Sequence, residues 1–271
     1  MEIGINPIAF SIGSLEVRWY GIFIALAIIT VLLWVLYFGR KVGITPDFVF
    51  GAAVIGVPTG IIVSKLLHVI DQFGYYTSNP GDILGRGGLT VFGAILGGVL
   101  GAWIYCRARK VPFGPVAGVA VPAIALAQVV GRIGCTINGC CHGEPTSLPW
   151  GFVYTHPDSY ATLNVAVHPT QVYEIILNLF LFVVVFWLLR GRLKPEGSLL
   201  AVYVALYSIG TFGIRFLRGD TDPFLGSLQQ AQVVSLVLVA FSLYFLATRS
   251  RWVGKERGLE GEGFFTNWGK G

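Results

Sequence analysis

Long apolar runs separated by short polar segments dominate the chain. A helix needs roughly 20 apolar residues, within a range of about 17–25, to cross the hydrocarbon core of a bilayer. Seven runs approach or reach this length, and the predicted spans are 17–38, 49–70, 88–106, 115–130, 169–189, 197–217 and 230–248. This pattern predicts an all-α, polytopic membrane protein with about seven transmembrane helices.

Two segments lie outside these runs. The connection 131–168 is the only sizeable segment between spans, and we expect it to form a small head outside the membrane. The end of the chain is rich in glycine and charge, a composition typical of flexible sequence. We therefore expect one integral membrane domain over residues 1–250, with 131–168 as its head, and a flexible cytoplasmic tail over 251–271.

Composition supports this class of protein. Apolar residues make up 54% of the 271 residues and charged residues only 12%, which excludes a soluble globular domain of this size. Residues 1–16 contain neither Lys nor Arg, so the basic start of a cleavable signal peptide is missing and the first span should be retained. Glycines in the third span allow close helix packing; they are Gly93, Gly97, Gly98 and Gly101.

The distribution of basic residues predicts the topology, because Lys and Arg favour the cytoplasmic side. One side of the membrane carries Arg40, Lys41, Arg107, Arg109, Lys110, Arg190, Arg192, Lys194, Arg249, Arg251, Lys255, Arg257 and Lys270. The other side carries Arg18, Arg86, Arg132, Arg215 and Arg218. We therefore expect the N-terminus outside and the C-terminus inside. Topology also explains the net charge of +5, so nucleic acid is not an expected partner.

Charged residues at membrane depth need a pairing or a function, since each costs at least about 2.5–3.5 kcal/mol at a helix centre. They are Arg18, Lys65, Arg132, Glu174, Arg215 and Arg218. The excess of arginine on the external side favours an anionic ligand, and the guanidinium fork suits a phosphate. For Arg18 and Arg86 the alternative is an interfacial side chain that reaches the lipid headgroups. Arg215 and Arg218 continue a helical stripe from Tyr207 and Thr211, which predicts one polar face on the sixth span.

A second polar stripe begins the fifth span, in the sequence HPTQVYEIILNL. Gln171, Glu174 and Asn178 recur at spacings of three and four, so they should share a face that points into the protein. The alternative to a reactive site is an interhelical hydrogen-bond network without chemistry. His68, which follows Lys65 by three residues, is a further polar group in the second span.

Three of the four cysteines lie in the stretch GRIGCTINGCCHGEPTSLPWG at 131–151. Thiolates and imidazole bind zinc, but Cys140, Cys141 and His142 are consecutive, and adjacent side chains rarely converge on one ion. We therefore expect no metal. A disulfide between Cys135 and either Cys140 or Cys141 suits an external loop better.

The chain resembles the prolipoprotein diacylglyceryl transferase family. GRIGCTINGCCHG is similar to the family signature, approximately GRxGNFxNxExxG. The other matching pieces are VRWYG at 17–21, the glycine-rich run at 87–98, HPTQVYE at 168–174, FLRGD at 216–220 and AQVVS at 231–235. They follow the family's order up to about residue 250.

The resemblance implies a seven-helix bundle with an external head in the cell membrane. It implies transfer of a diacylglyceryl group from phosphatidylglycerol to the lipobox cysteine of a prolipoprotein signal peptide, within the lipid bilayer, without cofactor or metal. The positions that match the family pattern are Tyr20, Arg132, Asn138, Gly143, His168, Gln171 and Glu174.

Several positions depart from the family pattern. Cys135 stands where the family has asparagine, and Cys140 stands where it has glutamate. Phe92 replaces a histidine that some members carry. In the sixth span, Thr211 and Arg215 stand where the family usually has an arginine and a glutamate.

For the reaction, we expect Arg132, helped by Arg215 or Arg218, to hold the phosphate and stabilise its charge as the bond breaks. His142 or His68 would accept the thiol proton, while His168 and Glu174 order the site. Two other functions fit the same residues: thiol redox chemistry through the cysteines, or binding or transport of phospholipid without its consumption.

Overall fold

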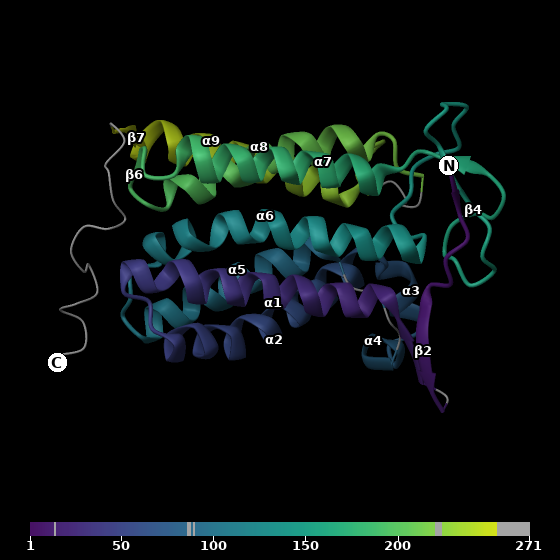
Figure 1. Ribbon diagram of the computed structural model, residues 1–271, viewed down its shortest axis with the longest axis horizontal. Coiled ribbons are helices and arrows are strands. Elements are labelled where there is room, and N and C mark those ends of the chain that lie inside the picture. The colour runs from purple at the N-terminus through teal and green to yellow at the C-terminus, as the bar shows by residue number, and fades with distance from the viewer. Residues whose placement is uncertain (14, 86–87, 89, 220–223, 254–271) are drawn as a thin grey trace. The chain divides into compact units, whose positions relative to one another are not determined.

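The computed structural model describes residues 1–13, 15–85, 88, 90–219 and 224–253. Arg86, Asp220 and most of the tail predicted over 251–271, from residue 254 onward, lie outside the described residues. The start of that predicted tail is ordered, because Arg251–Trp252 form a short paired strand. Within the described residues, the chain is mostly helical, and its long helices have short strands and turns between them (Figure 1).

Among the described residues, seven helices are long and apolar enough to cross a membrane, as the sequence predicted. They are α1 (Trp19–Gly39), α2 (Pro46–Asp71), α5 (Val91–Ala108), α6 (Phe113–Asn138), α7 (Thr170–Val183) with its π-helical continuation η2 (Val184–Leu189), α8 (Ser198–Arg215) and α9 (Gln230–Arg249). Shorter helical segments are η1 (Arg40–Val42), α3 (Phe73–Ser78) and α4 (Asp82–Gly85). The protein is therefore a multi-pass membrane protein.

The fourth span is longer than predicted. The expected helix at 115–130 starts at Phe113 and continues to Asn138, so the motif that begins at Gly131 is helical and the loop starts only at Gly139. Pro115 lies in the first turn, where a missing N–H costs no intrahelical hydrogen bond. Arg132 does not end the helix, because its charge is paired inside the protein.

Short strands, which the sequence analysis did not predict, order the segments between helices. They are β1 (Glu2–Ile3), β2 (Ile8–Ile12), β3 (Leu15–Arg18), β4 (Phe152–Tyr154), β5 (Ala166–Val167), β6 (Leu193–Lys194) and β7 (Arg251–Trp252). In the head, β4 pairs in parallel with β1 and antiparallel with β5. Tyr154, Ala161 and Val167 form its small buried core. Most of these strands are too short to show an alternating pattern.

The described residues form two compact units, and each is considered by itself. The first comprises residues 1–35 and 117–253, and the second comprises residues 36–116. The boundaries fall inside α1 and α6.

In the second unit, α2 and α5 pack backbone against backbone. A Cβ atom added at Gly97 would lie 2.8 Å from the Cα of Gly60, and one at Gly101 would lie 2.8 Å from the Cα of Gly56. Gly98 differs, since a Cβ there would meet nothing within 4 Å. Small residues at Gly97 and Gly101 thus allow the close approach that the sequence predicted, while a side chain at Gly98 would point into open space.

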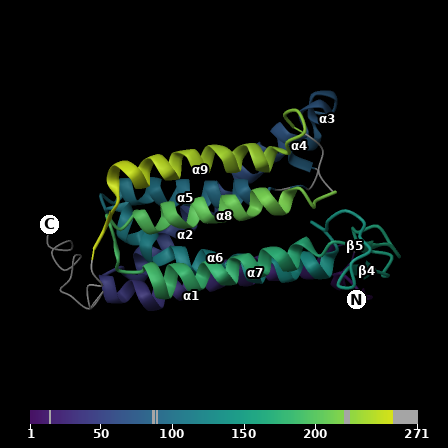
Figure 2. The same cartoon turned by 90° about the horizontal axis from the view of Figure 1, so that it is seen from above.

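In the first unit, the head lies at the ends of the helices where α6 finishes and α7 begins (Figures 1 and 2). Both stripes predicted from helical spacing point inward. Gln171, Glu174 and Asn178 are each at most 1% exposed on α7, and Thr211 is fully buried on α8. This arrangement places the polar residues of α6, α7 and α8 in one interior region.

Candidate active site

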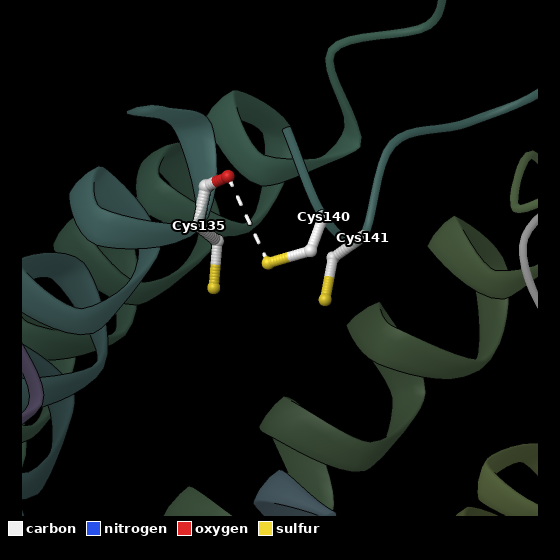
Figure 3. Close-up of side chains that lie close together, drawn as sticks. All are labelled: Cys135, Cys140 and Cys141. Carbon is white, nitrogen blue, oxygen red and sulfur yellow. Dashed lines mark hydrogen bonds between the residues drawn. The ribbon is translucent and has the colours of Figure 1, made fainter. Parts of the chain in front are cut away.

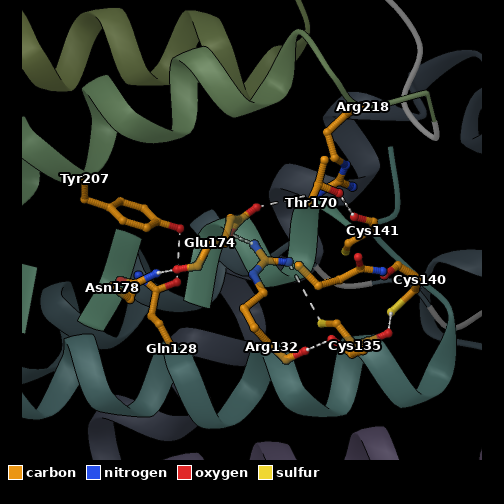
Figure 4. Close-up of polar contacts among 12 residues, drawn as sticks. Gln128, Arg132, Cys135, Cys140, Cys141, Thr170, Glu174, Asn178, Tyr207 and Arg218 are labelled. Carbon is orange, nitrogen blue, oxygen red and sulfur yellow. Dashed lines mark hydrogen bonds and ion pairs between the residues drawn. The ribbon is translucent and has the colours of Figure 1, made fainter. Parts of the chain in front are cut away.

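A buried ion pair lies at the centre of this region. Arg132 on α6 and Glu174 on α7 are 3% and 1% exposed, and the guanidinium Nη2 contacts the carboxylate Oε2 (Figure 4). Burial of either charge alone would be strongly unfavourable, so each depends on the other. The pair also fixes the register of α6 against α7 at the end next to the head.

Further along the helices, a hydrogen-bond network extends from the ion pair. The Tyr207 hydroxyl donates to Gln128 Oε1 at 3.0 Å, and Gln128 Nε2 donates to the Tyr203 hydroxyl at 3.0 Å. Tyr203 in turn donates to Asn178 Oδ1 at 3.3 Å. The sequence analysis did not select Gln128 or Tyr203. Gln128 stands four residues before Arg132 in an apolar helix, and this spacing is the signal that would have found it.

Two more arginines approach the same carboxylate from the end of α8. Arg218 Nη1 lies 4.0 Å from Glu174 Oε1, and Arg218 is 6% exposed. Arg215 lies within electrostatic reach of Arg218, Glu174 and Arg132, and its Nε has no hydrogen-bond partner among the described residues. Three guanidinium groups therefore surround one carboxylate in the described part of the site, an arrangement suited to a further anion.

The loop after α6 is fastened to the start of α7. Gln171 Nε2 donates to the Cys140 carbonyl at 2.8 Å, and the Thr170 hydroxyl donates to the Cys141 carbonyl at 2.5 Å. Gly143 forms a bridge with Arg218, and a Cβ on Gly143 would lie 2.6 Å from the Cβ of His168. Gly143 thus permits the close approach that brings Arg218 to the site. Thr170 is a contributor that the sequence analysis missed.

Asn138, the last residue of α6, links the site to the N-terminal segment. Its Oδ1 accepts from Arg18 Nη1 at 3.3 Å, and Arg18 also donates to the Asp158 carbonyl at 3.1 Å. The Arg18 guanidinium lies 4.4 Å from the centre of the Tyr160 ring. Arg18 therefore has hydrogen-bond partners in the head, and its interfacial alternative stays a prediction. Arg86 lies outside the described residues.

The predicted histidines and Tyr20 lie around the site rather than in the ion pair. His168 Nδ1 is 3.3 Å from the Tyr173 hydroxyl, which accepts from Trp150 Nε1 at 2.9 Å. His142 Nδ1 is 2.8 Å from the Gly143 carbonyl oxygen. Within the described part of the chain, the structure records no hydrogen bond from either histidine to Arg132 or Glu174. Tyr20, in the first turn of α1, has Arg132, Cys135, Cys140 and Cys141 as electrostatic neighbours.

Lys65 and His68 belong to the second unit. Lys65 Nζ lies 3.2 Å from the Tyr76 hydroxyl, and the His68 ring meets the Tyr76 ring edge to face. These contacts account for the polar pair on α2 within its own unit.

The cysteines differ from expectation in two ways. All four carry free thiols, so the expected disulfide is not formed. The expectation that consecutive cysteines diverge is also wrong, because the Sγ atoms of Cys135, Cys140 and Cys141 all lie within 4.8 Å of one another.

Hydrogen bonds from Cys135 and Cys140, with Arg218 and Arg132 nearby, outweigh burial and hold the pKa of Cys141 well below its usual range. For Cys140, a hydrogen bond with Cys135 lowers the pKa. A hydrogen bond with Cys141 and burial act in the opposite direction and outweigh it, so the pKa of Cys140 is raised to about 12.

Comparison with known proteins places this chain in a family. Residues 7–248 match the model of the family described as prolipoprotein diacylglyceryl transferase. The chain belongs to this family. It is 47% identical over 251 residues to a protein of Dehalococcoides mccartyi named phosphatidylglycerol–prolipoprotein diacylglyceryl transferase, covering 92% of this chain and 96% of that protein. Proteins of the same name from Clostridioides difficile and Clostridium tetani are 37% and 32% identical, covering 86% and 88% of this chain and 90% and 96% of theirs.

Most of the positions at which we expect departures from the family signature lie in the first unit. Cys135 and Cys140 bring two of the three sulfur atoms together, next to Arg132. Thr211 is fully buried on α8, one turn before Arg215. Phe92 is buried on α5, in the second unit. Four of these five positions therefore lie in the unit that holds the ion pair, on α6, α8 and the loop that follows α6, and Arg215 is the fourth of them.

Proposed function

We propose that this chain transfers the diacylglyceryl group of phosphatidylglycerol to the lipobox cysteine thiol of a prolipoprotein, the first step of lipoprotein maturation. Membership of the family and the names of its relatives support the reaction. The observation that carries the assignment of residues is the group of three arginines around Glu174. Such a group suits the phosphate of a lipid headgroup.

The reaction replaces a carbon–oxygen bond by a carbon–sulfur bond. The cysteine sulfur attacks the glycerol carbon that carries the phosphate ester, and the bond from that carbon to the ester oxygen breaks. Its electron pair leaves with the glycerol phosphate, and the thiol proton passes to a base. The products are a thioether and glycerol phosphate, and no oxidant or reductant is consumed.

The arginines supply what the leaving group needs. Negative charge develops on the phosphate oxygen as the bond breaks, and fixed guanidinium donors stabilise it most strongly in a site shielded from water. Arg132 would make this contact with help from Arg215 or Arg218. Glu174 holds Arg132 in position through the ion pair, and its single negative charge leaves the cluster cationic.

The remaining predicted residues have supporting roles. His142 would accept the thiol proton, since a free thiol is only a few per cent ionised at neutral pH, and His168 would help to order the site. Tyr20, next to Arg132 and the cysteines, would contact the reacting groups. Asn138, Gly143 and Gln171 hold the loop after α6 in place, as their contacts indicate.

The membrane setting follows from the charge distribution. We infer that residues 1–250 act as one membrane domain in the plasma membrane, with the N-terminus and the head outside and the C-terminus inside. Phosphatidylglycerol would then reach the site from the outer leaflet, and signal peptides would present their cysteine on the same side.

A complementation experiment tests the function. The chain is expressed in a bacterial strain depleted of its own transferase, and the N-terminal cysteine peptide of a reporter lipoprotein is analysed by mass spectrometry. We expect growth to be restored and the reporter cysteine to carry a diacylglyceryl adduct. A chain that reaches the membrane in folded form and leaves the reporter unmodified would refute the function, and would favour a protein that binds or moves phospholipid without consuming it.

A further inference from the structure

Three sulfur atoms meet at the end of α6. Cys135 comes from the last turn of the helix, and Cys140 and Cys141 come from the loop that follows (Figure 3). Their Sγ atoms lie within 4.8 Å of one another, and Cys135 is 3% exposed. The proposed transfer reaction uses none of these thiols, so the cluster needs its own explanation.

The backbone explains why two consecutive side chains point to one place. Gly139 has a φ angle of 75° and Cys141 one of 64°, both in the left-handed region. A non-glycine residue adopts this conformation only where its surroundings impose it. The hydrogen bonds of Thr170 and Gln171 to the two cysteine carbonyls hold the loop in this conformation. Contacts from the start of α7 therefore hold the loop in the conformation that brings the sulfur atoms together.

Polar N–H groups face two of the three sulfur atoms. Asn138 Nδ2 donates to Cys140 Sγ at 3.5 Å, and Arg132 Nη1 donates to Cys135 Sγ at 3.9 Å. Such donors stabilise sulfur that carries negative charge, and they are the outer-shell contacts that orient the ligands of a metal ion. A cluster of neutral thiols would gain little from them.

We propose that Cys135, Cys140 and Cys141 bind one zinc ion through three thiolates. Zinc–sulfur bonds of about 2.3 Å place tetrahedral ligands about 3.8 Å apart, so the sulfur atoms need to close by about 1 Å at most. Two of them lie on a loop and can move by side-chain rotation. The fourth position remains for water or an incoming thiol, as in zinc sites that keep an open position.

Charge favours a divalent ion. Three thiolates and one Zn²⁺ carry a net charge of −1, which is offset by the excess positive charge of the three arginines around Glu174. Monovalent copper with the same ligands would leave −2. Binding releases the thiol protons to solvent and involves no electron transfer, so no redox partner is needed.

Cobalt provides a direct probe of the site. The purified full-length chain in detergent, reduced with a phosphine, is titrated with Co²⁺ and then with Zn²⁺. We expect a thiolate-to-cobalt charge-transfer band that saturates at one ion per chain and disappears when zinc displaces cobalt. Cys135→Ser, Cys140→Ser and Cys141→Ser should each weaken or remove the band. Cys106→Ala is the matched control, because Cys106 is a buried cysteine on α5, in the other unit, and it should leave the band unchanged.

A second measurement needs no variant. Zinc should protect the three clustered cysteines of the wild-type chain from alkylation, as judged by peptide mass spectrometry, and should leave the reactivity of Cys106 unchanged. The site would be refuted if the reduced chain shows neither the cobalt band nor protection. Binding of copper(I) without cobalt or zinc would overturn the zinc assignment. Neither readout depends on diacylglyceryl transfer, so the two proposals fail separately.

Discussion

The α2–α5 pair and the α6–α7–α8 interface hold membrane helices together in different ways. In the first, glycines bring two backbones into contact, as at Gly97 and Gly60. In the second, the helices meet through a buried ion pair and a hydrogen-bond network around Arg132 and Glu174. Both meet the requirement for close contact in lipid, where apolar burial alone gives no preference for protein over lipid. The second also places two charged side chains, Arg132 and Glu174, inside the protein.

The ion pair should be the most sensitive point of this comparison. Glu174→Ala leaves the Arg132 guanidinium buried without its carboxylate, so we expect a loss of about 3–5 kcal/mol in the free energy of unfolding. The measurement is unfolding of the purified chain in mixed micelles. Glu174→Gln, which keeps the shape, should also destabilise, and a loss below about 1 kcal/mol for both variants would show that the pair contributes little.

The contact between Gly97 of α5 and Gly60 of α2 should be weakened by added side-chain volume, without any change of charge. Gly97→Ala adds a Cβ that would lie 2.8 Å from the Cα of Gly60, and we expect a loss of about 1–3 kcal/mol from overpacking. Gly98→Ala is the matched control, because a Cβ there meets nothing within 4 Å. The rate of transfer per folded molecule should be unchanged in both. Equal stability of the two variants would contradict the backbone contact.

The polar network should respond to the loss of one hydroxyl. Tyr203→Phe removes the acceptor of Gln128 Nε2 and the donor to Asn178 Oδ1 without a change of shape. We expect a loss of about 0.5–2 kcal/mol, the range for hydrogen bonds between membrane helices and for buried groups left unpaired. Tyr244→Phe, at an exposed position on α9, should have no measurable effect. An equal loss of stability in both variants would show that the hydrogen bonds of Tyr203 do not stabilise the protein.

We expect the smallest change in stability for the ion pair of Lys194 and Glu196, which lies outside the membrane. Burial tends to raise the pKa of Glu196, but a hydrogen bond from Lys194 at 2.9 Å lowers it below the ordinary value. The stabilisation is therefore full above the unfolded-state pKa of about 4.3 and is lost as the pH falls through the folded-state pKa. Because the pair is half-exposed, it should contribute less than about 1 kcal/mol. Lys194→Met should reduce the acid-side slope of stability against pH, and an unchanged slope would contradict the assignment.

Helical spacing was sufficient to predict the inward-facing stripes. Gln171, Glu174 and Asn178 recur at three and four residues in an apolar run, and all three are buried. The seven spans were also predictable, because length and composition determine them. The partner of Glu174 was not, since the contact to Arg132 depends on the register of two helices that are separated by a long loop.

The loop after α6, with Cys140 and Cys141, could not be predicted from the sequence. Adjacent side chains diverge in regular backbone, and the sequence analysis relied on that rule for Cys140 and Cys141. The positive φ angle of Cys141 breaks it, and the hydrogen bonds that hold this angle come from Thr170 and Gln171, distant in the sequence. Likewise, α6 continues to Asn138 because Arg132 is neutralised by a residue on another helix. Tertiary contacts decided both features.

The most direct test of the central proposal is the transfer rate of Arg132→Ala. The purified full-length chain is mixed with phosphatidylglycerol and a cysteine-containing signal peptide in micelles, and the thioether product is measured by mass spectrometry. Arg249→Ala, at the exposed end of α9, is the control, and the folded fraction of each protein is verified by gel filtration. We predict that folded Arg132→Ala loses at least about 100-fold in rate while Arg249→Ala stays near wild type. Transfer by folded Arg132→Ala at close to the wild-type rate would contradict the phosphate-binding role of the arginine cluster.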